Sequence, residues 1–275
     1  MLRLAWRVFK WLFLAGVLLG IVAAFVGLGL AMHVVEGLGK DLPAVGEGTY
    51  RPALATKVVD RNGVLLTTLH EEEIRNRIVP VSEIPRLTKL SFVAVEDERF
   101  YQHYGIDPRG ILRAAWKNFR AGGVVEGGST ITQQLAKNRF LKPERTVKRK
   151  LQEMILATRL ERSYSKDEIL GQYLNEIFFG KGMYGISSAA QFYFGKKTAD
   201  LSLAESAVLA SLPKAPNRFT PAAHSKACQD RQKLVLTKMW EQGYVTREEA
   251  LAAMAEPLKF TNEREKQEHV SEKAQ

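Results

Sequence analysis

The segment GGVVEGGSTITQQLAKN, residues 122–138, guides the interpretation of the whole chain. After its glycines come hydroxyl, amide and ammonium side chains, namely Ser129, Thr130, Thr132, Gln133, Gln134, Lys137 and Asn138. Such a run is too polar for a core helix. Its succession of hydroxyl, amide and ammonium groups is also too regular for a linker. Arranged along about three helical turns, these groups predict a surface that binds a strongly polar ligand.

Helical signals surround this segment and predict a mainly α domain. Helices are expected at residues 86–104, 108–120, 146–162, 166–177, 201–212 and 225–242. The sequence SKDE at residues 165–168 is a capping box that starts one of them. Before the helices, apolar runs on both sides of Asn62–Gly63 predict a small N-terminal β-hairpin over residues 57–69.

Residues 11–32 contain no charged side chain and predict a transmembrane helix. At 1.5 Å per residue this stretch spans about 33 Å, enough to cross the hydrocarbon core of a bilayer. Arg3, Arg7 and Lys10 precede it without an acidic residue, which predicts a cytoplasmic N-terminus and an exported remainder. A cleaved signal peptide is the alternative, although its apolar core would span only about 7–15 residues.

These features divide the sequence into five predicted regions. They are a cytoplasmic tail (1–10), the transmembrane helix (11–33), a juxtamembrane linker (34–55), the main domain (56–255) and a polar C-terminal tail (256–275). The net charge of +10 on a membrane-tethered protein suggests anionic partners, with simple solubility as the alternative. The single cysteine, Cys228, excludes an intrachain disulfide.

Three consecutive acids, Glu96, Asp97 and Glu98, interrupt an otherwise apolar helix. Glu96 is a candidate general base or acid, because a carboxylate among apolar neighbours has a raised pKa. His103, seven residues later, would lie two turns along the same helix face. The alternative is a charged stripe facing water, which applies to at least one of three consecutive acids.

A second carboxylate, Glu153, lies four residues after Arg149, so the two side chains share a helix face. They form either an ordinary surface ion pair or a site in which cations hold a carboxylate. Cations crowd this part of the sequence: Lys137, Arg139, Lys142, Arg145, Lys148, Arg149 and Lys150. Beside hydroxyl groups and glycines, such a cluster favours phosphate binding.

Several other chemistries do not fit the sequence. It contains no Walker loop and no HExxH zinc motif, and its two SxxK matches lack the KTG partner found in serine acylases. Nucleic acid is not expected as a partner of an exported domain without a binding motif. Two carboxylates and a phosphate-binding cluster favour a transferase using a diphosphate-linked sugar over a glycosidase, because a departing diphosphate needs cations.

The sequence resembles the peptidoglycan glycosyltransferases, glycosyltransferase family 51, which occur within class A penicillin-binding proteins and as monofunctional transglycosylases. Four motifs carry the resemblance in order: EDERFYQHYG at 96–105, GGSTITQQLAKN at 127–138, RKLQE at 149–153 and KDEILGQYLN at 166–175. The likeness covers about residues 56–252. The fifth motif departs from the family pattern, with Arg231–Gln232 in place of an Arg-Arg pair.

The resemblance implies a lysozyme-like, mainly α fold and the polymerisation of lipid II into glycan strands with release of polyprenyl diphosphate. It implies that Glu96 is the base acting on the acceptor hydroxyl. Glu153 would assist at the diphosphate, in some members through a divalent cation (Mg or Mn), and no organic cofactor is expected. The implied substrate-binding residues are Asp97, Ser129, Thr130, Gln134, Lys137, Asn138, Arg145 and Arg149.

The resemblance also implies partners and a location. Lipid II, the growing glycan strand and other cell-wall synthesis proteins are the expected partners, at the cytoplasmic membrane with the catalytic domain outside. Because no second domain follows residue 255, the chain is expected to be monofunctional. Two alternatives stay open: a lysozyme-like hydrolase or lytic transglycosylase that cleaves glycan, and a non-catalytic membrane-anchored scaffold that would tolerate loss of Glu96.

Overall fold

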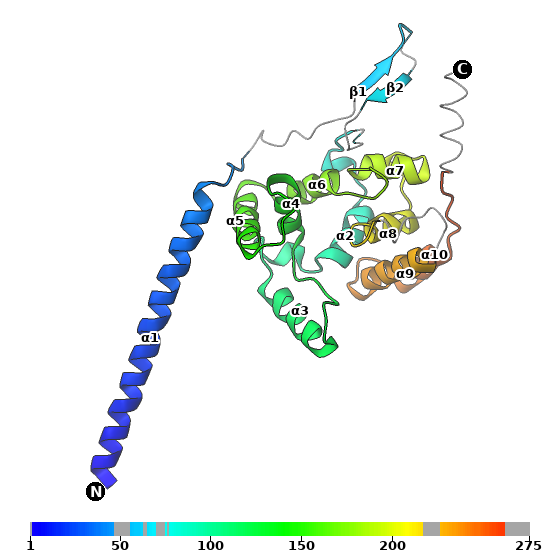
Figure 1. Ribbon diagram of the computed structural model, residues 1–275. Coiled ribbons are helices and arrows are strands. Elements are labelled where there is room, and N and C mark those ends of the chain that lie inside the picture. Colours follow the sequence, from blue (N-terminus) through cyan, green and yellow to red (C-terminus); the bar gives the residue numbers. More distant parts are fainter. Residues whose placement is uncertain are drawn as a thin grey trace.

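The computed structural model describes residues 2–46, 56–62, 65–69, 75, 77–216 and 226–261. Within these ranges the protein is mainly α-helical, as predicted (Figure 1). Its helices are α1 (Leu2–Lys40), α2 (Arg86–Glu96), α3 (Pro108–Ala121), α4 (Ile131–Phe140), α5 (Val147–Ser163), α6 (Lys166–Glu176), α7 (Ile186–Phe194), α8 (Leu203–Ser211), α9 (Lys226–Glu241) and α10 (Arg247–Ala255). The strands are β1 (Thr56–Val59) and β2 (Leu65–Leu69), and short 3-10 helices lie at Val81–Glu83, Phe100–Gln102 and Thr198–Asp200.

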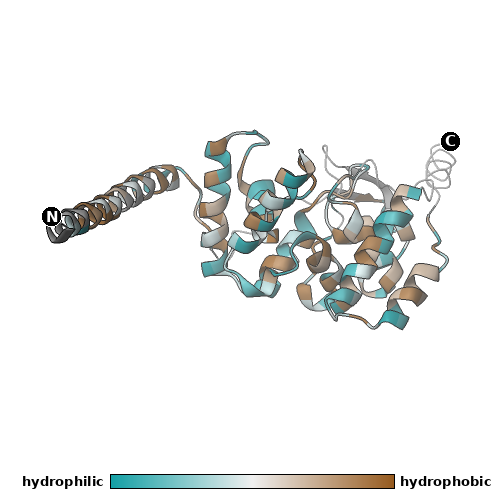
Figure 2. Cartoon of the chain, turned by 90° about the horizontal axis from the view of Figure 1, so that it is seen from below, coloured by the Kyte–Doolittle hydropathy of each residue, from teal (hydrophilic) through white to brown (hydrophobic). Residues whose placement is uncertain are grey.

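Helix α1 projects away from the remaining helices (Figures 1 and 2). The part from Lys10 to Lys40 reaches a mean hydropathy of 2.5 and is long and apolar enough to cross a membrane, by length and composition. Because α1 continues to Lys40, residues 34–40 of the predicted linker are helical. Pro43, which cannot continue a helix, follows closely. Residues 47–55 of that linker and 262–275 of the C-terminal tail lie outside the described residues.

The predicted N-terminal hairpin is confirmed. Strands β1 and β2 pair antiparallel, with Thr56 opposite Leu69. In the turn between them, the Asp60 carboxylate accepts a hydrogen bond from the backbone N–H of Asn62 at 2.8 Å, a local bond that favours turns. Figure 1 shows the hairpin at the edge of the molecule, away from the helices that form the core.

The hydrophobic core forms where α2 packs on α8 and α9 and where α4 packs on α5 and α6. Its fully buried side chains include Phe92, Phe100, Leu135 and Phe179, and burial of each stabilises the fold by about 1.5–3 kcal/mol. The apolar stripe predicted for α6 is buried at Ile169, Leu170, Tyr173, Leu174 and Ile177. The capping box of Ser165 and Glu168 is present at the start of α6.

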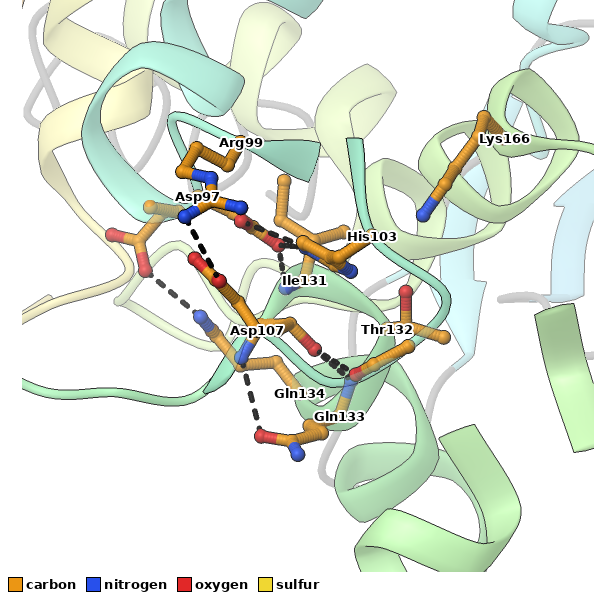
Figure 3. Close-up of polar contacts among 12 residues, drawn as sticks. Asp97, Arg99, His103, Asp107, Ile131, Thr132, Gln133, Gln134 and Lys166 are labelled. Atoms are coloured by element: carbon orange, nitrogen blue, oxygen red, sulfur yellow. Dashed lines mark hydrogen bonds and ion pairs between the residues drawn. The ribbon is translucent and has the colours of Figure 1, made fainter. Parts of the chain in front are cut away.

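The prediction of one helix over residues 86–104 is wrong, because α2 ends at Glu96. Asp97 leaves the helical conformation, with φ at −159°. Its carboxylate accepts a hydrogen bond from the backbone N–H of Ile131, 34 residues further along the chain, at 3.0 Å. His103 therefore does not share a helix face with Glu96, and its Nε2 instead lies 3.0 Å from the Asp97 carboxylate (Figure 3).

Candidate active site

Glu96 lies at the C-terminal end of α2, half-buried and in contact with α4. Its Oε2 accepts a hydrogen bond from Nε2 of Gln134 at 3.0 Å, and Oε1 of Gln134 accepts one from the Tyr173 hydroxyl at 3.3 Å. Burial, and then the charges of Glu96 and Asp97, raise the pKa of Tyr173 well above its ordinary value. Tyr173 therefore stays a hydrogen-bond donor, and it keeps the Gln134 amide N–H₂ group facing the Glu96 carboxylate.

Glu96 opens onto a cavity of about 390 Å³, which we call the Glu96 cavity. One of its walls carries Glu98 and Glu126, and Arg113 forms ion pairs with both carboxylates. The cations Lys214, Arg231 and Lys238 also line the cavity. Gln134 and Ser129 complete the part of the cavity nearest to α4. The cavity therefore combines one carboxylate held by an amide with charges of both signs.

A second cavity of about 490 Å³ is lined by the cations Lys137, Arg145 and Arg149 and by the acids Glu144 and Glu176, and we call it the cation cavity. Lys137, Asn138, Arg145 and Arg149, four of the predicted substrate-binding residues, all line it. Phe178 and Tyr184 provide aromatic surface on its wall. Three of the seven cations in the sequence cluster thus come together at this cavity, whereas Arg139, Lys142, Lys148 and Lys150 do not line it.

Lys137 couples the two cavities electrostatically. Burial lowers its pKa and the neighbouring positive charge of Arg149 lowers it further, whereas the negative charge of Glu96 raises it. Because Glu96 lines the other cavity, its effect on the Lys137 ammonium group means that these two charges lie near each other. Gln134 and Lys137, three residues apart, lie on the same face of α4.

Glu153 is buried on α5 with 3% of its surface exposed. One carboxylate oxygen accepts a hydrogen bond from Arg149, and the other accepts one from Nζ of Lys150 at 2.9 Å. Lys150 also donates to the Ser129 hydroxyl at 2.8 Å. The interpretation of Glu153 as part of an ordinary surface pair is therefore wrong, since its carboxylate is held among cations inside the protein.

The same contacts bear on the predicted divalent cation. Among the described residues, no group of three or more His, Cys, Asp or Glu side chains could hold a metal ion. Both oxygens of Glu153 already bind cationic side chains, which compete with a metal for the same lone pairs. These residues do not fit a divalent cation in the present arrangement, and the metal remains a prediction.

Asp97 and Thr130 were predicted to bind substrate, but their polar groups are used inside the protein. The Asp97 carboxylate contacts His103 and the backbone N–H of Ile131 (Figure 3). The Thr130 hydroxyl caps α4 by accepting from the backbone N–H of Gln133 at 3.1 Å, and it donates to the carbonyl of Gly105 at 2.6 Å. Both residues therefore fix where α4 begins, and through α4 they position Gln134 and Lys137.

Some residues around Glu96 gave no functional signal in the sequence. Tyr173 fitted the apolar stripe of its helix, and its hydroxyl partner Gln134 lies 39 residues away. Arg231 belongs to the imperfect fifth motif, and it lines the Glu96 cavity. Burial lowers the pKa of Arg231, and the charge of Glu96 raises it. The residue after it, Gln232, is buried and donates to the carbonyl of Ala204 at 3.1 Å, so its side chain belongs to the core.

Comparisons with known proteins assign the chain to a family. A family model described as Transglycosylase matches residues 62–240, more than half of the chain. The chain belongs to the transglycosylase family. This transglycosylase is 46% identical to penicillin-binding protein 1F of Bacillus subtilis (strain 168) over 204 residues. It is 44% identical to penicillin-binding protein 1A of Aquifex aeolicus (strain VF5) over 250 residues.

The transglycosylase chain spans about a third of the length of the curated relatives it matches. The matches cover 74% of this chain and 28% of the Bacillus protein, and 90% of this chain and 34% of the Aquifex protein. A crystal structure of penicillin-binding protein 1A from Haemophilus influenzae matches with 24% identity and a TM-score of 0.46, over 81% of this chain and 25% of that one.

Proposed function

We propose that this transglycosylase polymerises lipid II into glycan strands and releases polyprenyl diphosphate. The observation that carries the proposal is the placement of Glu96 in one cavity and of Lys137, Arg145 and Arg149 in another, with α4 contributing side chains to both. A glycosyl transfer from a diphosphate needs a base for the incoming hydroxyl and cations for the departing anion. The two cavities supply these two functions separately.

In the proposed reaction, the Glu96 carboxylate removes the proton of the acceptor sugar hydroxyl. The hydroxyl oxygen attacks the anomeric carbon of the donor sugar, and the bond from that carbon to the diphosphate oxygen breaks. The diphosphate leaves with the bonding electron pair. Gln134 holds the base in place, and the ammonium and guanidinium groups of Lys137, Arg145 and Arg149 neutralise the charge that develops on the diphosphate.

The state of Lys137 supports an anionic ligand in the cation cavity. Its pKa is lowered by burial and by Arg149, so the protonated form is disfavoured when no anion is nearby. A diphosphate bound between Lys137 and Arg149 would offset their mutual repulsion and raise the pKa of Lys137 toward its ordinary value. This preference for an anion does not depend on the identity of the sugar.

The proposed location follows from the substrate. Lipid II is confined to a membrane, and α1 would hold the enzyme at the same surface, which raises the effective concentration of one for the other. Arg3, Arg7 and Lys10 favour a cytoplasmic N-terminus and therefore an extracytoplasmic catalytic domain. The growing glycan strand is the second substrate, and proteins of cell-wall synthesis are proposed partners.

The proposal is tested with the purified full chain in detergent, fluorescent lipid II and no other enzyme, resolved on a gel. A ladder of lengthening glycan is expected. Preformed glycan serves as the matched alternative substrate. Cleavage of preformed glycan without polymerisation would replace the proposal with a hydrolase or lytic transglycosylase, and inactivity toward both substrates would favour a scaffold.

A further inference from the structure

The end of helix α1 and the residues that follow it contact helix α5. The C-terminal end of α1 and the chain after it, residues 39–46, form what we call the juxtamembrane segment, and this segment lies against α5. Arg159 of α5 donates through Nη2 to the carbonyl of Gly39 at 2.8 Å. Its Nη1 donates to the carbonyls of Leu42 and Pro43 at 3.4 and 3.3 Å. One guanidinium group therefore binds three backbone carbonyls of the segment.

Two further bonds extend the contact toward the end of α5. The Ser163 hydroxyl donates to the carbonyl of Val45 at 3.2 Å, and the Tyr164 hydroxyl donates to the carbonyl of Gly46. Between these bonds, the side chains of Leu42 and Val45 pack against the hydrophobic core. The segment is thus held by both polar and apolar contacts, which the sequence did not reveal because its Gly and Pro residues suggested a simple linker.

The guanidinium group of Arg159 stabilises the C-terminal end of helix α1. The last carbonyls of an α-helix have no partner within the helix, and the C-terminal end carries partial negative charge. A forked, permanently charged group satisfies several such oxygens at once. Gly39 is buried, and a Cβ at this position would lie 3.2 Å from Nη2 of Arg159, so a side chain here would crowd the guanidinium.

Helix α5 connects this contact with the candidate active site. Arg149 and Glu153 lie near its start, and Arg159 lies near its end. Ten residues of α-helix rise about 15 Å, so the helix sets a nearly fixed distance between the cation cavity and the end of α1. Figure 1 shows α5 as the helix beside which the chain leaving α1 passes.

We propose that Arg159 is a positioning residue that docks the juxtamembrane segment on α5 and so holds the cation cavity at a fixed height and orientation above the membrane surface. The proposal rests on the proposed function, since it concerns a diphosphate attached to a lipid in the bilayer. With a docked segment, the cavity stays within reach of that diphosphate. With an undocked segment of several flexible residues, the domain samples many heights and the effective concentration of the site falls.

Hydrogen–deuterium exchange on the full chain in lipid nanodiscs tests the docking itself. Arg159→Ala should raise the exchange rate of the amides of residues 39–46 by about tenfold, because local opening becomes easier. Arg162→Ala is the matched control, since it removes the same charge from an exposed position on the same helix. Unchanged exchange in Arg159→Ala, or an equal rise in Arg162→Ala, would overturn the role of Arg159.

The positioning role is tested by comparing two substrates of the same chemistry. On long-chain lipid II in bilayers, Arg159→Ala should polymerise about tenfold more slowly than the wild type. On a water-soluble, short-chain analogue, its rate should equal that of the wild type. A loss of the same size on both substrates would show that Arg159 acts on the fold or the site, and no loss on either would show that height above the membrane does not matter.

These results separate the inference from the proposed function. A wild type that polymerises neither substrate contradicts the proposed function and the positioning role together, while the exchange experiment still decides whether Arg159 docks the segment. A wild type that polymerises both substrates, with an Arg159→Ala variant that matches it on both, contradicts the inference alone.

Discussion

The two cavities beside α4 differ in how their charges are balanced. In the Glu96 cavity, the carboxylates of Glu98 and Glu126 are paired with Arg113, and Glu96 itself contacts the neutral amide of Gln134. In the cation cavity, Lys137 and Arg149 lie close enough that the charge of Arg149 lowers the pKa of Lys137. Glu96 in the first cavity thus contacts a neutral amide, whereas the second cavity is lined by three cations and two acids.

Under the proposed function, proton removal and charge neutralisation would take place in different cavities. A base paired directly with a cation would lose basicity, because the ion pair favours the carboxylate form. A diphosphate site with a strong acid in its centre would repel its ligand. Glu96 and Lys137 line different cavities, and the charge of Glu96 still raises the pKa of Lys137.

The largest expected effect comes from Glu96→Gln. The amide cannot accept the proton of the incoming hydroxyl, so the polymerisation rate on lipid II should fall by about 10²–10⁴-fold, with unchanged circular dichroism. Glu98→Gln is the matched control in the same cavity, because its carboxylate is already paired with Arg113, and it should retain most activity. Near-normal polymerisation by Glu96→Gln would show that Glu96 is not the base.

Lys137→Ala should have the next largest effect. The variant loses one of the cations that neutralise the negative charge developing on the diphosphate. The chemical step, measured in single turnover with saturating lipid II, should therefore slow by about 10²-fold. Lys148→Ala removes an exposed cation from the same region and serves as the control. If both variants lose activity equally, the effect is one of general surface charge and the cation cavity has no special role.

Glu153→Gln distinguishes a supporting carboxylate from a reacting one. The change leaves Arg149 and Lys150 without their charged partner in a buried place, so unfolding in urea should show a loss of about 2–3 kcal/mol. Activity should fall through misplacement of Arg149, and added Arg149→Lys should then cost little more. A variant with full stability and no activity would instead place Glu153 in the reaction.

Tyr173→Phe should have a smaller effect on activity. Without the hydroxyl, the Gln134 amide can turn its oxygen toward Glu96, and the lost hydrogen bond corresponds to about 1 kcal/mol or roughly fivefold in rate. An unchanged polymerisation rate would show that Gln134 needs no support from Tyr173.

The smallest expected effect is on the alkaline limb of the pH–rate profile. The pKa of Lys137 is lowered from its ordinary value, so its charge is present at low pH and is lost as pH rises through that lowered pKa. Activity should therefore decline at a lower pH than an ordinary lysine would cause. Lys137→Arg should keep activity to higher pH, because guanidinium stays charged. If the alkaline limb lies at the same pH in Lys137→Arg and in the wild type, a group other than Lys137 causes it.

Much of the fold was predictable because its signals are local. The apolar stripe of α6, the Ser165–Glu168 capping box and the turn at Asn62 depend on neighbours within a few residues. The break after Glu96 was not predictable, since it depends on a bond from Asp97 to a backbone N–H 34 residues away. The docking of residues 39–46 on α5 was missed for the same reason, with bonds that join residues more than 115 positions apart.

Some residues of the candidate site were likewise predictable from nearby sequence and others were not. The cations of the cation cavity cluster in the sequence, so their joint placement was expected. The cations of the Glu96 cavity were not, because Lys214, Arg231 and Lys238 belong to α9 and to the loop after α8, far from the acid in sequence. Tyr173 was hidden by its apolar neighbours, and only its hydroxyl contact separates it from a core residue.

The central claim, that proton removal and diphosphate binding lie in separate cavities, is tested most directly by measuring the affinity for polyprenyl diphosphate. The full chain in detergent, Glu96→Gln and Lys137→Ala would be compared at one salt concentration. We expect Glu96→Gln to bind as tightly as the wild type and Lys137→Ala to bind about tenfold more weakly. Weaker binding by Glu96→Gln with normal binding by Lys137→Ala would contradict the division of roles between the two cavities.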